Sequence, residues 1–584
     1  MELLKQQILP LVQEAVSKLG TSNLPIETML QPTRELDQGD LTLPCFPFAK
    51  ALKMSPVAIA ESLASDFPKH TSLCEVTAIN GYLNFRVSPH WLASQLLTGA
   101  METTHDVAER SVLIEHTSAN PNGPFHVGRA RNAILGDTLV RLHRLWGHEV
   151  TAEYYVDDMG KQVAVLAWAL EHLSSSEVER LLSDRDAVNP TWETKADHQR
   201  VRWYQAAQKL RQHEDEAPAI EKAIGDLVHA SENGDQSVLD SFEQAYQPVL
   251  DGMLETLGRL GIQFDRFTKE SRFVTNGEVS ALMDELGALE INGTADNGAQ
   301  YLDLGARGLK GKTEFFYRRG DGSSLYATRD IAYHRWKWSM SNELINVLGE
   351  DHKLQAKQVG LTLEELGLER PEVVFYSFIK LPEGKMSTRQ GNVVFMDDLL
   401  EEAKAQAAKV VADLRQDYEQ ETIHHIAEAV GTSAVRFNII NVSPEKGFSF
   451  RWEDALSFES GSAPFIMYSH TRACSIHRRV SELLGSEVKT TINLPKELPQ
   501  GLVDLLRVLG RHNDCLRKVV LEHRPHLFAE QLLHLANGYN AFYRDCYIID
   551  EGEVNEFFYL VSELARDVLR KGMEGLGIVP LESM

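Results

Sequence analysis

From about residue 109 the sequence alternates between short apolar runs and amphipathic segments with helical spacing. The apolar run 112–114 is followed by a segment whose apolar positions recur every three or four residues: Ala130, Ile134, Leu135, Leu139 and Leu142. A second strand-like run, "AEYYV", is followed by the helical segment "KQVAVLAWAL". Strands that alternate with helices form parallel sheets with crossover helices. We therefore expect an α/β domain of Rossmann type, built on a parallel sheet.

The alternation is limited to the middle of the chain. We expect the α/β domain to cover 109–396, with a charged helical insertion at about 173–255. The sheet pattern resumes with apolar runs at 344–348 and 372–379.

The two ends of the chain differ from this domain. Residues 1–108 have helical ends, a Gly39-Asp40 turn and a strand over 81–88, which predicts a small N-terminal α+β domain. After residue 397 strand patterns nearly vanish, so we expect a helical connector over 397–430 and an all-α helical bundle over 431–584.

Composition limits the classes of function. The net charge of −25 excludes a protein coated in positive charge, although it permits a local basic patch. The five cysteines are scattered and form neither a disulfide framework nor a metal-binding pair. The N-terminus is an amphipathic helix rather than a signal peptide, and no apolar run is long enough to span a membrane. We expect a cytoplasmic protein that is not associated with membranes.

The segment "SANPNGPFHVGRARN", 118–132, lies directly behind the first apolar run. The sequence predicts a strand, a tight loop and a helix N-terminus, which is where α/β sheets bind phosphates. His126 can donate to a phosphate oxygen, and Gly128 lets a base or phosphate approach the backbone. The alternative is a surface loop with a chance histidine.

A second segment, "EGKMSTRQGN", 383–392, is a glycine-bracketed loop that follows a later strand. Lys385 and Arg389 are cations, and Ser387 and Thr388 are hydroxyl donors. Such groups stabilise the charge that develops on departing pyrophosphate. The alternative is a solvated polar loop.

A third segment, "INVLGEDHKLQ", 345–355, ends a strand at Gly349 and then presents Asp351 and His352. Ligands bind at this edge of open α/β sheets, although Asp351 could instead cap a helix. The segment "GARGLKGKT" resembles a phosphate-binding loop, but the required first glycine is Ala306, so we exclude that function.

The order of these three segments resembles that of class I aminoacyl-tRNA synthetases. Further stretches resemble the arginyl-tRNA synthetase family over essentially the whole chain: "IEHTSANPNGPFHVGRARNAILGD", "YYVDDMGKQ", "SLYATRDIAYHRWK", "GKMSTRQGNVVFMDDLL", "SAPFIMYSHTRACSI", "HLANGYNAFYRDC" and "GLGIVPLESM". Several separated matches in one order are more specific than any single motif.

The resemblance implies roles for individual residues. The catalytic residues are expected to be His126, Gly128, Arg129, Lys385, Ser387 and Arg389. ATP is expected to contact Pro124, His126, Gly128, Arg129, Gly349, Asp351, His352 and Met386. Arginine is expected to contact Glu115, Ser118, Asn120, Tyr326, Asp330 and His352. Tyr326 and Asp330 are four residues apart, so they share a face if helical, and a carboxylate suits a guanidinium.

The chain departs from the common family pattern at four positions. Arg129 replaces the second histidine of the first signature, and Thr388 replaces the second lysine of the later loop. A substitute lysine before the first signature is absent, because that position is Gly123, and His352 replaces a frequent glutamine. These changes leave open a non-catalytic paralogue that binds tRNA or arginine.

A second alternative is another class I synthetase, such as the cysteinyl enzyme. The sequence contains no Cys/His zinc set, which argues against it. The implied reaction joins L-arginine to Mg·ATP, releases pyrophosphate, and passes the arginyl group to the 2′-hydroxyl of the terminal adenosine of tRNA(Arg). No structural zinc is expected, and we expect a monomer.

The resemblance also predicts where tRNA binds. The N-terminal unit resembles the domain that contacts the tRNA elbow, and the helical tail is expected to bind the anticodon. The segment "IMYSHTRACSIHRRV" contains Arg472, Arg478 and Arg479 without an acid, and Tyr468 is available for base stacking. The alternative is a solvated helix face.

Overall fold

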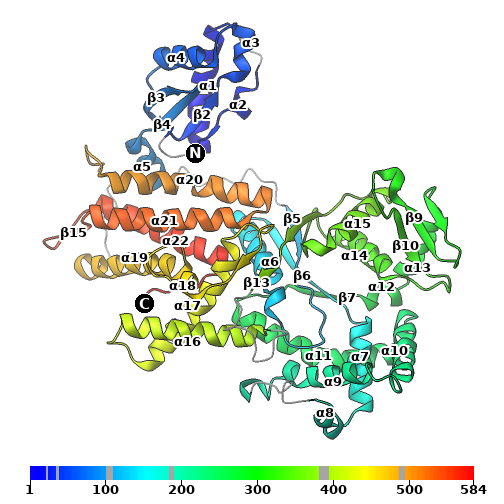
Figure 1. The fold of residues 1–584 in the computed structure, drawn as a ribbon. Coiled ribbons are helices and arrows are strands. Elements are labelled where there is room, and N and C mark those ends of the chain that lie inside the picture. Colours follow the sequence, from blue (N-terminus) through cyan, green and yellow to red (C-terminus); the bar gives the residue numbers. More distant parts are fainter. Residues whose placement is uncertain (21–23, 34–37, 100–109, 183–189, 381–393, 486–493) are drawn as a thin grey trace.

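The structure is a computed structural model that describes residues 1–20, 24–33, 38–99, 110–182, 190–380, 394–485 and 494–584 (Figure 1). A central parallel sheet lies between a helical unit on one side and two further units on the other, and the N-terminal unit stands above the helical unit. Among the helices that the structure describes, none combines the length and the apolar composition that a bilayer span requires.

The N-terminal unit is a four-stranded antiparallel sheet covered by helices, with strand order β1-β2-β4-β3. Its elements are α1 (Glu2–Lys18), α2 (Ile26–Met29), β1 (Gln31–Pro32), β2 (Leu41–Pro44), α3 (Ala49–Leu52), α4 (Pro56–Asp66), β3 (Leu73–Ile79), β4 (Tyr82–Val87) and α5 (Pro89–Leu97). Helix α1 buries one apolar stripe, Leu4, Ile8, Val12 and Val16, at a spacing of four residues.

The central sheet has five parallel strands in the order β12-β11-β5-β6-β7. Its strands are β5 (Ser111–Glu115), β6 (Glu149–Val156), β7 (Arg266–Lys269), β11 (Glu343–Gly349) and β12 (Glu372–Tyr376), and its helices are α6 (Val127–Trp146), α7 (Lys161–His172), α14 (Tyr326–Met340) and α15 (Lys353–Glu365). The strand order reverses between β5 and β11, and ligands bind at such a reversal.

Between β6 and β7 the described residues form further helices: α8 (Ser175–Leu181), α9 (Ala196–Leu210), α10 (Ala217–Glu232) and α11 (Gln236–Arg259). This is the region in which the sequence predicts a helical insertion. Helices α9 and α11 pack on α7, so the insertion adds a second layer beside the sheet (Figure 1).

A second, antiparallel sheet that the sequence pattern does not predict lies between β7 and α14. It comprises α12 (Ser271–Thr275), α13 (Glu278–Gly287), β8 (Asn292–Thr294), β9 (Gln300–Asp303) and β10 (Glu314–Arg318). The segment "GARGLKGKT" connects β9 to β10 within this sheet. It does not join a strand to a long helix, which agrees with its exclusion as a phosphate-binding loop.

The C-terminal part is helical. Its elements are β13 (Ile379–Lys380), α16 (Met396–Leu414), α17 (Gln420–Ile440), β14 (Phe448–Ser449), α18 (Trp452–Ala455), α19 (Ala463–Leu484), α20 (Gln500–Glu522), α21 (Pro525–Asp545), β15 (Ile549–Asp550), β16 (Glu553–Val554) and α22 (Glu556–Leu576). The predicted fold class, a Rossmann-type parallel sheet with a small N-terminal α+β unit and a C-terminal helical bundle, is confirmed.

The sequence pattern predicts a boundary between the connector and the helical bundle at residues 430 and 431. Helix α17 continues without interruption through this position. Its apolar face is buried on both sides of that position, from Ile423 to Ile440, so no break in the fold occurs there. Arg436 of this helix is fully buried and donates to Asp137 of α6 and to the carbonyls of Leu260 and Leu576. The helical unit is therefore bonded directly to the central sheet's first helix.

Candidate functional site

The loop after β5 leaves the strand through a strained turn. Thr117 and Ser118 both have positive φ angles, 69° and 39°, which residues with a side chain rarely adopt. The turn brings the Ser118 hydroxyl back toward the Glu115 carboxylate, at 3.3 Å, while the same hydroxyl accepts from the Tyr155 amide at 3.1 Å. The strain therefore serves to hold Glu115 and Ser118 at the carboxyl edge of the sheet.

His126 and Gly128 lie at the N-terminus of α6, as the sequence predicts. His126 is the residue before the first turn, and its side chain caps no backbone amide. Burial, and then the charge of Arg129, lower the pKa of His126 to about 4, so the imidazole is neutral at pH 7. A Cβ on Gly128 would lie 3.0 Å from the His126 ring, so glycine leaves room for the histidine itself.

Arg129 is half-buried on the first turn of α6. The two acids with which it could have paired are occupied: Asp137 binds Arg141 and Arg436, and Asp158 accepts from Ser271. Within the described residues Arg129 has no ion pair with either acid, so its guanidinium is available to a ligand.

The two signature segments meet at this helix start. Residues 125–127 pair with 394–396: the Val127 amide donates to the Val394 carbonyl at 3.0 Å, and the Met396 amide donates to the Phe125 carbonyl at 2.8 Å. The predicted loop residues Lys385, Met386, Ser387 and Arg389 lie outside the described residues.

Position 123, where the sequence resemblance leads us to look for a substitute lysine, is a glycine that faces helix α9. A Cβ on Gly123 would lie 2.6 Å from Val201. Pro124, which follows it, is buried. A longer side chain at position 123 would therefore require α9 to move.

The carboxyl end of β11 presents Gly349, Asp351 and His352, again as the sequence predicts. Both side chains are exposed. The sequence analysis missed Gln355, one helical turn later: its amide donates to Asp330 at 3.2 Å, and its oxygen lies 3.3 Å from His352 Nδ1. Gln355 thus links His352 to Asp330, and only its spacing from His352 could have indicated it.

Asp330 and Tyr326 both lie in the first turns of α14. Burial opposes ionisation of Asp330, but the neighbouring His334, Lys337 and Gln355 outweigh it and lower the pKa of the carboxyl. Asp330 is therefore an anion with 21% of its side chain exposed, suited to binding a cation. Burial raises the pKa of Tyr326 to about 12, so its hydroxyl stays a donor.

Asn120 is turned toward helix α7, where its amide donates to Gln162 at 3.1 Å. The described structure therefore holds Glu115 and Ser118 together at the end of β5. It links Asp330 of α14 to His352 through Gln355. Asn120 is fixed separately.

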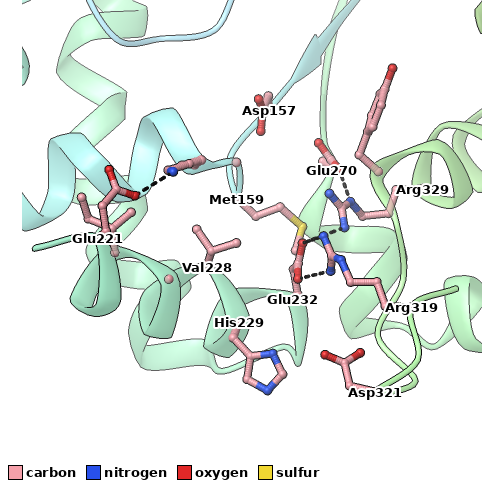
Figure 2. Close-up of a pocket in the computed structure, with 15 residues that line it drawn as sticks. Asp157, Met159, Glu221, Val228, His229, Glu232, Glu270, Arg319, Asp321 and Arg329 are labelled. Atoms are coloured by element: carbon pink, nitrogen blue, oxygen red, sulfur yellow. Dashed lines mark hydrogen bonds and ion pairs between the residues drawn. The ribbon is translucent and has the colours of Figure 1, made fainter. Parts of the chain in front are cut away.

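A cavity of about 550 Å³ opens beside Tyr326 (Figure 2). Its walls come from the β6–α7 turn, helix α10 and the start of α14, with Met159, Ile224 and Val228 as apolar members. Glu232 and Glu270 also line it, and their carboxylates are paired with Arg319 and Arg329. Asp157 projects into this space, and burial raises the pKa of its carboxyl.

The predicted basic strip lies on α19, at the side of the helical unit away from the central sheet (Figure 1). Arg472 is half-buried between two tyrosines, with its guanidinium 4.9 Å from the Tyr468 ring and 4.7 Å from the Tyr543 ring. Arg478 and Arg479 are exposed. Tyr543, on the far side of Arg472, was missed by sequence reasoning.

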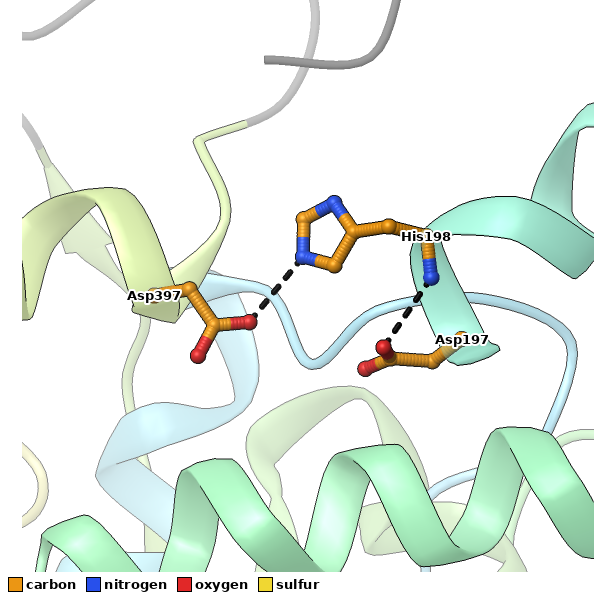
Figure 3. A group of neighbouring side chains, drawn as sticks. All are labelled: Asp197, His198 and Asp397. Carbon is orange, nitrogen blue, oxygen red and sulfur yellow. Dashed lines mark hydrogen bonds and ion pairs between the residues drawn. The ribbon is translucent and has the colours of Figure 1, made fainter. Parts of the chain in front are cut away.

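One group of potential metal ligands occurs among the described residues: Asp197, His198 and Asp397 (Figure 3). The ammonium of Lys195 already lies among them, 2.7 Å from Asp397 and 3.3 Å from Asp197. The lysine ammonium occupies the position that a metal ion would take. The group is therefore a buried charge network that connects α9 to the start of α16.

Comparisons with known proteins match the whole architecture. Residues 92–452 match the family of class I (R) tRNA synthetase catalytic domains, 466–584 match the DALR anticodon binding domain, and 6–87 match the arginyl tRNA synthetase N-terminal domain. The chain is 38% identical over 579 residues to an arginine–tRNA ligase of Methanocella arvoryzae, with 98% of each chain covered. It is 37% identical to that of Archaeoglobus fulgidus, covering 94% of this chain and 96% of the relative.

A solved structure agrees with these relatives. Thermus thermophilus arginyl-tRNA synthetase superposes with a TM-score of 0.80 at 25% identity, covering 99% of this chain and all of that one. The fold and the site at the strand ends therefore define a class I aminoacyl-tRNA synthetase. Within that class, the matched domains and the full-length relatives show that the chain belongs to the arginyl-tRNA synthetase family.

Proposed function

We propose that the chain activates L-arginine with Mg·ATP and transfers the arginyl group to tRNA(Arg). The environment of Asp330 is the observation that supports arginine as the substrate. Asp330 is a partly exposed anion that His334 and Gln355 hold in place, close to Tyr326. A positioned carboxylate binds a guanidinium through two parallel hydrogen bonds, which an ammonium cannot form. Glu115, Ser118, Asn120 and His352 complete the proposed arginine site.

The ATP phosphates are proposed to bind at the N-terminus of α6. Free amides and the helix dipole attract anions there, and the neutral His126 imidazole can donate one hydrogen bond. Arg129 contributes the positive charge that pairs with the phosphates. The other proposed contacts to ATP are Pro124, Gly128, Gly349, Asp351 and His352. Lys385, Met386, Ser387 and Arg389 are proposed to act from the following loop. In-line attack by the arginine carboxylate then requires chiefly positioning and charge stabilisation.

The terminal adenosine of tRNA is proposed to enter the cavity beside Tyr326. This cavity includes Tyr326 of the proposed arginine site, and Met159, Ile224 and Val228 give part of its wall an apolar surface that suits a base (Figure 2). An adenosine seated there would bring its 2′-hydroxyl toward the arginyl carboxyl group. The volume of the cavity is in the range typical of small-ligand sites.

Replacing Asp330 by asparagine should raise the KM for arginine by about 30-fold or more, equivalent to about 2 kcal/mol. The amide keeps the shape of the side chain and removes the charge that pairs with the guanidinium. The measurement is steady-state aminoacylation of total tRNA with arginine varied.

Asp321→Asn serves as a matched control. Asp321 lines the cavity beside Tyr326, and its carboxylate accepts a hydrogen bond from the Ser323 hydroxyl. This replacement should leave the arginine KM unchanged. Equal arginine KM in Asp330→Asn and the unmodified protein would remove Asp330 from the pocket.

The domains are proposed to divide the tRNA between them. Residues 1–108 contact the elbow, 109–396 with the insertion at about 173–255 carry the chemistry, 397–430 connect, and 431–584 bind the anticodon. The exposed rings of Tyr468 and Tyr543, on either side of Arg472, support this, because unpaired bases stack on exposed aromatic rings. The Arg472 guanidinium contacts both rings and places a positive charge between them.

Replacing Arg472, Arg478 and Arg479 together by alanine should weaken tRNA binding and reduce its dependence on salt, because fewer counterions are released. The measurement is tRNA affinity over a range of salt concentrations, alongside ATP affinity, which should not change. Arg570→Ala is the control, since Asp567 and Glu574 already pair with that arginine. If both affinity and salt slope persist in the triple variant, the strip is only a solvated helix face.

The remaining features are proposed from the sequence. The chain is proposed to work in the cytoplasm as a monomer, with Mg²⁺ entering as part of the ATP substrate and with no structural zinc. Size-exclusion chromatography with light scattering tests the monomer, and metal analysis of the purified protein tests the zinc.

A further inference from the structure

Behind the proposed arginine site lies a completely buried ammonium group, that of Lys337 on α14. Its side chain is 0% exposed. Its Nζ donates to Glu115 Oε2 at 2.6 Å and to Asn346 Oδ1 at 2.9 Å, and lies 3.3 Å from His334 Nε2. The same Nζ lies 4.3 Å from the centre of the Tyr333 ring. A buried charge of this kind is tolerated only when its partners are fixed.

The ammonium determines how its neighbours are oriented. An ammonium only donates, so the atom of Asn346 that faces it must be the oxygen. The amide nitrogen of Asn346 therefore faces His334 Nε2, at 2.8 Å. Two donors thus point at Nε2, which makes it the acceptor and places the ring proton on Nδ1.

His334 Nδ1 faces Asp330. It lies 3.0 Å from the carboxylate oxygen Oδ1 and 2.8 Å from the Asp330 backbone carbonyl. The proton that Lys337 and Asn346 force onto Nδ1 is therefore donated to Asp330. One lysine orients Glu115 directly and Asp330 through two intermediates, Asn346 and His334.

We infer that Lys337 is a positioning residue of the arginine site, which fixes both substrate-binding carboxylates through the Lys337–Asn346–His334 relay. The inference rests on the proposed function, because it takes Glu115 and Asp330 as the residues that contact arginine. Lys337 itself, being fully buried, does not touch the substrate.

The relay also sets the charge that the substrate meets. Two carboxylates and one buried ammonium leave a single net negative charge, which matches the single positive charge of the arginine side chain. Without Lys337 the Glu115 carboxylate, only 13% exposed, would lose the charged partner that orients it. Arginine would then meet one oriented anion rather than two.

Lys337→Met keeps the length of the side chain and removes the charge. It should raise the KM for arginine in aminoacylation about tenfold or more, while the KM values for ATP and tRNA stay within about threefold. In a Glu115→Gln background the same replacement should have an effect at least about threefold smaller, since residues in one network are coupled. A merely structural lysine would show neither the selective KM change nor the coupling.

Lys195→Met is the matched control for stability, because Lys195 is also a buried lysine bonded to a carboxylate, Asp397. Its partners among the described residues, Asp197, Thr256 and Asp397, do not belong to the proposed arginine site. This replacement should lower the melting temperature as Lys337→Met does and leave the arginine KM unchanged. If Lys195→Met raises the arginine KM equally, the effect is general destabilisation and the inference is wrong.

Two outcomes separate the inference from the function on which it rests. An unchanged arginine KM in Lys337→Met, with a raised KM in Glu115→Gln, would overturn the relay alone. An unchanged arginine KM in Glu115→Gln would remove Glu115 from the site and overturn the relay with it. A raised KM in both single variants, with the coupling described, would establish Lys337 as a positioning residue.

Discussion

Arg129→Ala should slow formation of arginyl-adenylate by about 10²-fold or more, which is the cost of losing one donor to a transition state. The usual signature has a second histidine here and a second lysine in the later loop, and this chain has Arg129 and Thr388. Position 123 cannot supply the missing charge, because it is a glycine. Arg129 is always charged and can bridge two phosphate oxygens.

An alternative role for Arg129 would be to stabilise the fold through an ion pair with Asp137 or Asp158, and the structure argues against this role. Both acids are bonded to other groups. The folding stability of Arg129→Ala should therefore change little, because neither Asp137 nor Asp158 loses a partner.

Single-turnover adenylate formation with tRNA bound measures the effect, and thermal unfolding measures stability. Arg144→Ala is the matched control, since Arg144 lies on the same helix and pairs with Asp265 on the surface. A variant of Arg129 that unfolds early but activates arginine at the normal rate once folded would show that the residue is structural.

Features set by neighbours in the chain could be predicted from the sequence. The strand, loop and helix start around His126 follow from an apolar run, turn-forming residues and a helical pattern within about 35 residues. The position of Asp330 one turn after Tyr326 follows from the same local spacing. These interpretations needed no knowledge of tertiary structure.

Features that depend on contacts between distant segments could not be predicted. Phe125 pairs with Met396, and Lys337 reaches Glu115, across more than two hundred positions in each case. Tyr543 joins Tyr468 around Arg472 without any spacing signal. The antiparallel strands β8 to β10 were missed because three to five residues carry too little alternation to distinguish them from loops.

Acid should destabilise the protein through buried histidines. Burial lowers the pKa of His143 to about 3, and lowers the pKa values of His116 and His512 to about 4. In the unfolded chain these imidazoles titrate near pH 6.5, so below that pH the unfolded state binds protons that the folded state excludes. Their contribution to stability is complete above about pH 6.5 and is lost as the pH falls toward the folded pKa values.

Each of these histidines should lower the free energy of unfolding by about 2 kcal/mol between about pH 7 and pH 5, and the three together by about 6 kcal/mol. Buried carboxyls act in the opposite direction, since burial raises the pKa values of Asp157 and Asp158. A differential measurement on one histidine therefore isolates the effect.

His143→Gln should reduce the loss of stability between about pH 7 and pH 5 by about 2 kcal/mol. Glutamine keeps a polar group beside His148 and has no proton to gain. Urea unfolding followed by tryptophan fluorescence at both pH values gives the difference, and His424→Gln, which changes an exposed histidine of α17, should give none. His143 stacks on His523 where α6 meets the α20–α21 turn. If His143→Gln and the unmodified protein lose equal stability in acid, His143 binds its proton without opening this interface, and the prediction is wrong.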